Sequence, residues 1–156
     1  MQSSIGEGLV VATTADGLNT DLSHIMSPLV TTNYNNESVK LNVYSGVNKT
    51  TIAGLVKQMR FTGALRLLPR GTVNTLFAIT DNGMTRINTV DFSLAGKNGD
   101  LFYAPKTTYN FQALKGRNQA DLFIENGQIT VAYHAITDKI GIPLDLKANI
   151  PGISAV

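Results

Sequence analysis

The chain has 156 residues, the usual size of one domain, and it contains no cysteine, so it has neither disulfides nor a thiolate metal site. Charged residues make up only 15% of the chain, against an average of about 25% in soluble domains. The net charge is +2, and the basic residues are scattered rather than gathered into a stripe. A nucleic-acid-binding face is therefore not expected.

Uncharged polar residues replace the missing charges. The sequence contains 17 threonines, which suit half-exposed strands, and 14 asparagines, which suit the turns between strands, so the composition favours a β protein. Residues 1–8 have no positively charged segment, and no apolar run approaches the ~20 residues of a membrane span. We expect a soluble protein that is made in the cytoplasm without a signal peptide and does not bind a membrane.

Regular periodicity begins at residues 39–43, where three apolar residues alternate with polar ones and predict a half-buried strand. The next stretch, residues 51–59, is the one helical candidate, because its apolar residues recur at the spacing of a helix face after a threonine that could cap the first turn. Gly54 lowers the helix propensity there by about 1 kcal/mol relative to alanine. We predict a short helix over 51–59.

Strand signals become frequent after residue 60. Residues 61–68 and 73–80 are typical of strands, and the Asn82-Gly83 pair that follows is a strong hairpin signal, because a type I′ turn needs a positive φ at both central residues. The return strand is predicted over 84–94. A second Asn-Gly pair at 98–99 predicts the next turn.

Further strands are predicted at 101–103 and 109–114. The clearest hairpin covers 121–136 and turns at a third Asn-Gly pair, Asn126-Gly127. A last alternating strand covers 142–147.

The predicted fold is an all-β antiparallel sandwich or small barrel of about eight to ten strands, with at most one short helix, near residues 51–59. We predict a single domain over residues 1–156. Both ends are apolar, and we expect them to form extended arms, an N-terminal arm over 1–14 and a C-terminal arm over 148–156.

No catalytic, cofactor or metal motif is present. The two histidines, His24 and His134, are far apart in the sequence and do not supply a zinc ligand set, and His134 is expected to be an ordinary strand residue. A hydrolase triad would have to combine Ser23, a histidine and Asp138, but no nucleophile-elbow glycines surround a serine. We predict no catalytic, cofactor-binding or metal-binding residues.

The acidic and aromatic residues have structural explanations. The aspartates mostly stand beside glycine or asparagine or at strand ends, where turn chemistry accounts for them, and they are Asp16, Asp21, Asp81, Asp91, Asp100, Asp121, Asp138 and Asp145. The chain contains no tryptophan, and basic residues are not interleaved with its aromatic residues. We therefore expect the aromatic residues to lie in the core rather than to form a stacking platform for RNA or sugar. They are Phe61, Phe77, Phe102, Phe111, Phe123, Tyr103, Tyr109 and Tyr133.

This pattern favours a non-enzymatic structural or assembly protein, namely a virion component such as a virus or bacteriophage capsid-decoration (cement) or minor capsid protein. Its expected partners are its own copies, a major capsid protein or another particle protein, and no nucleic acid, membrane or cofactor. It would be made in the host cytoplasm and lie on the virion surface. Two alternatives stay open: a ligand- or carbohydrate-binding tail or fibre module, and an uncharacterised hydrolase that would require His24 or His134.

Overall fold

The computed structural model describes residues 8–29, 38–67, 71–102, 107–117, 120–125 and 128–133. These residues are mostly β-structure, which confirms the predicted all-β class. Their elements, in chain order, are β1 (Leu9–Thr13), β2 (Asn19–Met26), β3 (Ser38–Lys40), α1 (Val43–Asn48), β4 (Ile52–Ala53), β5 (Val56–Leu67), β6 (Gly71–Thr80), β7 (Gly83–Asn88), β8 (Leu94–Lys97), the 3-10 helix η1 (Asn98–Leu101), β9 (Phe111–Arg117), β10 (Ala120–Glu125) and β11 (Gln128–Tyr133).

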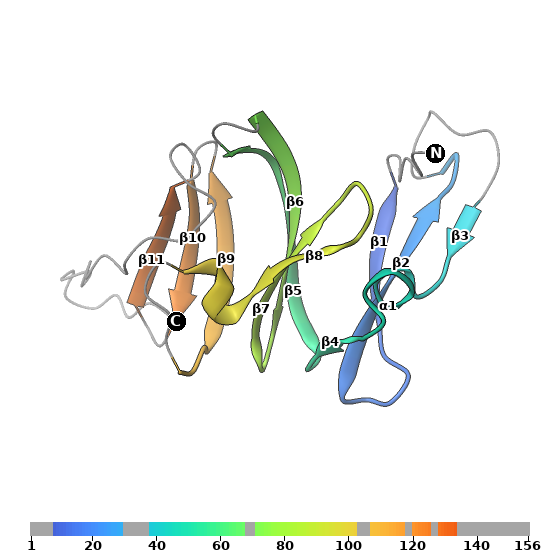
Figure 1. The fold of residues 1–156 in the computed structure, drawn as a ribbon, viewed down its shortest axis with the longest axis horizontal. Coiled ribbons are helices and arrows are strands. Elements are labelled where there is room, and N and C mark those ends of the chain that lie inside the picture. The colour runs from blue at the N-terminus through green and yellow to red at the C-terminus, as the bar shows by residue number, and fades with distance from the viewer. Residues whose placement is uncertain are drawn as a thin grey trace.

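The strands form three antiparallel sheets (Figure 1). The first has the order β1-β2-β3, with β4 also paired to β2; the second has the order β5-β6-β7-β8; the third has the order β9-β10-β11. The β5–β8 sheet lies between the other two (Figure 1). The described strands do not close a barrel, so of the two predicted architectures the layered one is favoured.

The middle sheet is buried on both faces, and β6 shows this most clearly. Because successive residues of a strand point to opposite faces, Phe77 and Ile79 enter one core while Leu76 and Ala78 enter another. The core shared with the β9–β11 sheet contains Phe77, Ile79, Met84, Leu101, Phe102, Phe111, Leu114 and Phe123. The core shared with the β1–β4 sheet contains Leu22, Tyr44, Ile52, Leu76, Ala78, Ile87 and Phe92.

The helix predicted over residues 51–59 is wrong. This stretch contains β4 and the start of β5, and Gly54 between them has a φ of +89°. The hydroxyl of Thr20 donates to the carbonyl of Gly54 at 2.8 Å and accepts from the backbone N–H of Val56 at 3.0 Å. These contacts with β2 use the backbone groups that a helix would need, so tertiary pairing overrides the helical spacing.

The α-helix occurs earlier, at α1, where the alternation of residues 39–43 predicted a strand. That strand exists only as β3, which ends at Lys40. Asn42 and Lys49, on either side of the helix, both have left-handed backbone conformations. The alternation therefore identified the strand but placed its end about three residues too late.

The hairpin predicted at Asn82-Gly83 is present, since β6 and β7 are antiparallel neighbours. Its turn lies one residue earlier than expected. Asp81 and Asn82 connect the strands, and neither has a positive φ, so this is not the predicted type I′ turn. Gly83 instead begins β7 with a φ of +130°.

The side chain of Asn98 explains why Gly83 is needed. Its Oδ1 accepts from the backbone N–H of Met84 at 3.0 Å, and its Nδ2 donates to the carbonyl of Asn82 at 3.3 Å. A Cβ on Gly83 would lie 1.8 Å from Asn98 Oδ1, which is an impossible approach. The second Asn-Gly pair therefore begins η1, and its asparagine binds the β6–β7 hairpin. The strand predicted over 101–103 is wrong for Leu101, which lies in η1.

The strand predicted over 84–94 is divided into β7 and β8. Phe92, in the connecting loop, is buried and has a φ of +60°, which is unusual for a bulky residue. The side chain of Asn48 secures this loop, because its Nδ2 donates to the carbonyl of Phe92 and its Oδ1 accepts from the N–H of Leu94, both at 2.8 Å. Alternation alone did not reveal this interruption.

The later strands agree with the sequence where they are described. β9 covers most of the strand predicted at 109–114, and β10 and β11 form the predicted antiparallel hairpin. Its Asn126-Gly127 turn, the strand predicted at 142–147 and the C-terminal arm over 148–156 lie outside the described residues. Of the N-terminal arm, Leu9–Thr13 forms β1 in the first sheet.

Candidate interaction surface

A row of apolar side chains crosses the first sheet on the face that is turned away from the middle sheet. Leu9 of β1 lies opposite Ile25 of β2, and Ile25 lies opposite Val39 of β3. Directly opposed residues of antiparallel strands point to the same face, so the three side chains form one row. Leu9 is 49% exposed and Val39 is 57% exposed, so much of this row faces solvent. We call it the outer row.

The opposite face of the same sheet is part of a core. Val10 and Ala12 of β1 pack on the cluster that contains Leu22 of β2. His24, next along this face of β2, is buried, and its ring centroid lies 6.0 Å from that of Phe92. The sheet thus carries apolar side chains on both faces. The described residues pack over the inner face, whereas on the outer face they cover Ser23 and leave Leu9 and Val39 exposed.

A pocket of about 340 Å³ lies farther along the outer face, beyond the outer row. It opens between the β1–β2 hairpin, the connection before α1 and the start of β4. Its lining residues are Thr13, Thr14, Ala15, Asp16, Asn19, Asp21, Ser23, Leu41, Asn42 and Thr51. The pocket therefore contains two carboxylates, those of Asp16 and Asp21. The hydrogen bonds of each carboxylate show whether it is free to act on a ligand.

Asp16 holds the β1–β2 turn together. Its Oδ1 accepts from the backbone N–H groups of Leu18 at 2.8 Å and Asn19 at 2.7 Å, and its Oδ2 accepts from Asn19 Nδ2 at 2.7 Å. Thr14 Oγ1 also donates to Oδ1, at 3.3 Å. The hydrogen bonds from Asn19 and Leu18 hold the pKa of Asp16 well below its usual range. Its role is that of a turn residue, as the sequence predicted.

Asp21 stabilises the start of α1. The local N-cap residue, Asn42, makes no side-chain capping hydrogen bond, but Asp21 Oδ1 accepts from the backbone N–H of Ser45 at 3.1 Å. A carboxylate at this end of a helix is electrostatically favourable. Burial, followed by the negative charge of Asp21, raises the pKa of Tyr44 above its usual value. Asp21 therefore acts as a cap supplied from another strand.

Of the residues considered for a hydrolase triad, the two that the structure describes, Ser23 and His24, do not come together. Ser23 and His24 are consecutive in β2 and point to opposite faces of the sheet, and Ser23 Oγ accepts from the backbone N–H of Asn42 at 3.2 Å. His134 and Asp138 lie outside the described residues. Among the described residues, no group of three His, Asp or Glu side chains is placed to hold a metal ion.

Three other aspartates also have local partners. Asp81 forms an exposed ion pair with Lys57. Asp91 accepts from the hydroxyl and the N–H of Ser93, which lowers its pKa, and Asp100 accepts from the N–H of Lys97. The contacts of Asp91 and Asp100 agree with the predicted turn and strand-end roles, whereas the partner of Asp81 is a side chain of β5. The side chains of Asp121, Asp138 and Asp145 are not described.

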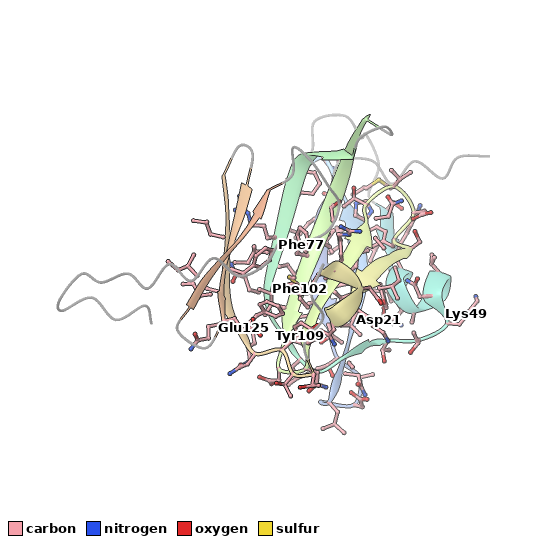
Figure 2. The ribbon with its side chains drawn as sticks, turned by 60° about the vertical axis from the view of Figure 1, so that its left-hand side comes forward. Asp21, Lys49, Phe77, Phe102, Tyr109 and Glu125 are labelled. Carbon is pink, nitrogen blue, oxygen red and sulfur yellow. The ribbon has the colours of Figure 1, made fainter. Side chains whose placement is uncertain are left out.

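Most of the described aromatic side chains are core residues, as predicted. Four phenylalanines are buried in the core between the middle sheet and the β9–β11 sheet, namely Phe77, Phe102, Phe111 and Phe123. The rings of Phe102 and Phe111 stack with their centroids 5.9 Å apart. Figure 2 shows Phe77, Phe102 and Tyr109 beside the middle sheet, with Asp21 away from them on the side of α1. Phe61 is the exception: it is 57% exposed, because it lies on the edge strand β5.

The outer row was not identified from the sequence. Residues 9–12 are uniformly apolar, a pattern that fits a strand with apolar contacts on both faces, but one strand cannot reveal which neighbours extend its row. Leu9, Ile25 and Val39 become a surface only through the pairing of three strands.

No family model, curated protein or solved structure matches this chain significantly. Within the described residues, no helix is long and apolar enough to cross a membrane.

Proposed function

We propose that the protein is a non-enzymatic assembly subunit that binds other protein subunits through the outer face of its first sheet. The outer row carries this proposal. Its side chains are apolar and exposed on a sheet whose reverse face is already packed, and exposed contiguous apolar surface is typical of protein–protein interfaces. The carboxylates of the neighbouring pocket are engaged in turn and helix-capping hydrogen bonds, which fits a structural role.

The narrower form of the proposal is a virion component, a capsid-decoration or minor capsid protein of a virus or bacteriophage. The low charge content, the lack of cysteine and the exposed apolar row support a subunit that is stabilised by neighbours in a particle. Quantitative mass spectrometry of particles purified from the natural source should find the chain in a fixed multiple per particle. Its absence from every purified particle fraction would remove this form of the proposal.

Binding to the particle can be mapped with one surface substitution and one matched control. Val39→Ser lies in the outer row, and we expect it to weaken particle binding. Val90→Ser is the control, because Val90 is 56% exposed, almost equal to Val39, but lies in the β7–β8 loop. Co-sedimentation with particles should separate the two variants, while their thermal unfolding should be similar. Equal binding by both would show that the outer row is not the contact surface.

A carbohydrate- or ligand-binding module is the second candidate, and the pocket beside the β1–β2 hairpin favours it. Hydroxyl and amide groups beside apolar surface in one concave site match the mixed polar and apolar faces of a sugar. A glycan array is the direct test, with Thr51→Arg as the variant that should block the pocket. A glycan that binds the wild type and not this variant would support the module, and an array without hits would count against it.

A further inference from the structure

We infer that β1 pairs edge to edge with β1 of a second copy of this chain, forming a two-fold antiparallel dimer. This inference rests on the proposed assembly function and names a partner for its first sheet. Among the described strands, only β2 pairs with β1, so the other edge of β1 has no strand partner within the described residues. Such an edge is a template for another strand.

The distribution of charge along the sheet edges distinguishes β1. Natural proteins protect open edges with charged residues, especially lysine. Four of the edge strands follow this rule and carry Lys or Arg: β3 with Lys40, β5 with Lys57 and Arg60, β8 with Lys97, and β9 with Lys115 and Arg117. β1 has the sequence LVVAT, without charge or proline, and its pairing with β2 has no bulge. The other uncharged edges among the described strands are β4, which has only two residues, and β11, after which the chain is outside the described residues.

The core beside β1 is incomplete at the same edge. Val10 lies opposite His24, and Ala12 lies opposite Leu22. The two β2 residues are fully buried, whereas Val10 and Ala12, on the same face, are only half-buried. The inner face of the sheet therefore ends at β1, and the flank formed by Val10 and Ala12 is only partly covered. A strand added there would bring further apolar side chains against that flank and lower its exposure.

The sequence of β1 is compatible with pairing to itself. An antiparallel pair centred on Val11 uses all five residues of both strands, placing Val11 opposite Val11 and Val10 opposite Ala12 of the second copy. The inner faces then match Val10 with Ala12, and the outer faces match Leu9 with Thr13. No like charges lie opposite each other in this register. Because the two copies are related by a two-fold axis, the assembly is complete at two copies.

The absence of cysteine allows a direct geometric test. Directly opposed residues in an antiparallel pair have Cα atoms about 4.5–5.5 Å apart, within the range of a disulfide. Under mild oxidation, Val11→Cys should give a disulfide-linked dimer at concentrations where Val90→Cys, in the exposed β7–β8 loop, stays mostly unlinked. Equal cross-linking of the two variants, or none of Val11→Cys, would overturn the pairing.

Light scattering supplies the second test. The wild-type chain should have twice its 16.8 kDa mass. Val11→Lys should shift toward the monomer because two ammonium groups would face each other, and Val90→Lys, in the β7–β8 loop, should remain dimeric. Circular dichroism checks that each variant is folded, and the cysteine pair decides the question if Val11→Lys does not fold. A wild-type monomer at all concentrations would refute the dimer. If that monomer still binds particles, the proposed assembly function stands without the dimer. If the dimer is cross-linked but the chain is absent from particles, the dimer stands and only the virion proposal is removed.

Discussion

The side-chain amide of Gln58 pairs with both backbone groups of Leu114. Gln58 Nε2 donates to the carbonyl of Leu114 at 2.7 Å, and Leu114 N donates to Gln58 Oε1 at 3.0 Å. Gln58 lies on β5, at the edge of the middle sheet, and Leu114 lies on β9, at the edge of the third sheet. A side chain thus takes the place of a strand neighbour and connects two layers.

Replacing Gln58 should loosen this connection. In Gln58→Ala, the buried Leu114 loses the partners of its N–H and carbonyl, and we expect a loss of about 1–3 kcal/mol in unfolding free energy. Urea unfolding measures the total loss. Hydrogen exchange of the Leu114 amide reports the local effect and should accelerate. A variant as stable as the wild type, with unchanged exchange, would mean that water replaces the amide without cost.

The capping of α1 by Asp21 predicts a graded pair of variants. Asp21→Ala removes the acceptor for the N–H of Ser45 and should lower the unfolding free energy by about 0.5–2 kcal/mol. Asp21→Asn keeps a side-chain oxygen and should lose less. Urea unfolding at pH 7 gives both values. Equal losses in the two variants would indicate that the charge, rather than the hydrogen bond, stabilises the helix.

Glycine is required at Gly83 and not at Gly46, which makes the two positions a matched pair. Gly83→Ala combines an unfavourable φ of +130° with a collision at Asn98, so it should destabilise by more than about 1 kcal/mol. Gly46 lies inside α1, and no other part of the chain comes within 4 Å of the place that a Cβ would take, so Gly46→Ala should stabilise by about 0.5–1 kcal/mol. Thermal unfolding should move in opposite directions for the two variants.

The lowered pKa of Asp16 predicts an acid-dependent contribution to stability. Because the pKa is lower in the folded chain than the unfolded value of about 3.9, the contribution is complete above about pH 4 and is lost as the pH falls toward the folded value. Asp16→Asn cannot titrate, so its unfolding free energy should depend less steeply on pH between about 4 and 2. Urea unfolding across this interval measures both slopes. Identical slopes would assign the acid sensitivity to other groups.

The candidate surface illustrates why the site was harder to predict than the strands. Residues 9–12 could be recognised as apolar from the sequence, and Val39 as part of an alternating strand. Their combination with Ile25 depends on the register of two strand pairs. Register is set by contacts between segments far apart in the chain, which a single strand does not encode.

The sequence by itself determined the all-β class, most strand positions, the hairpin near Asn82 and the turn role of Asp16, because strand periodicity and turn chemistry act over a few neighbouring residues. Only the tertiary structure decided the place of the helix. Backbone groups around Gly54 pair with Thr20, and α1 receives its cap from Asp21, 24 residues before Ser45. Both outcomes depend on hydrogen-bonding partners that become neighbours only after folding, and the same holds for the open edge of β1.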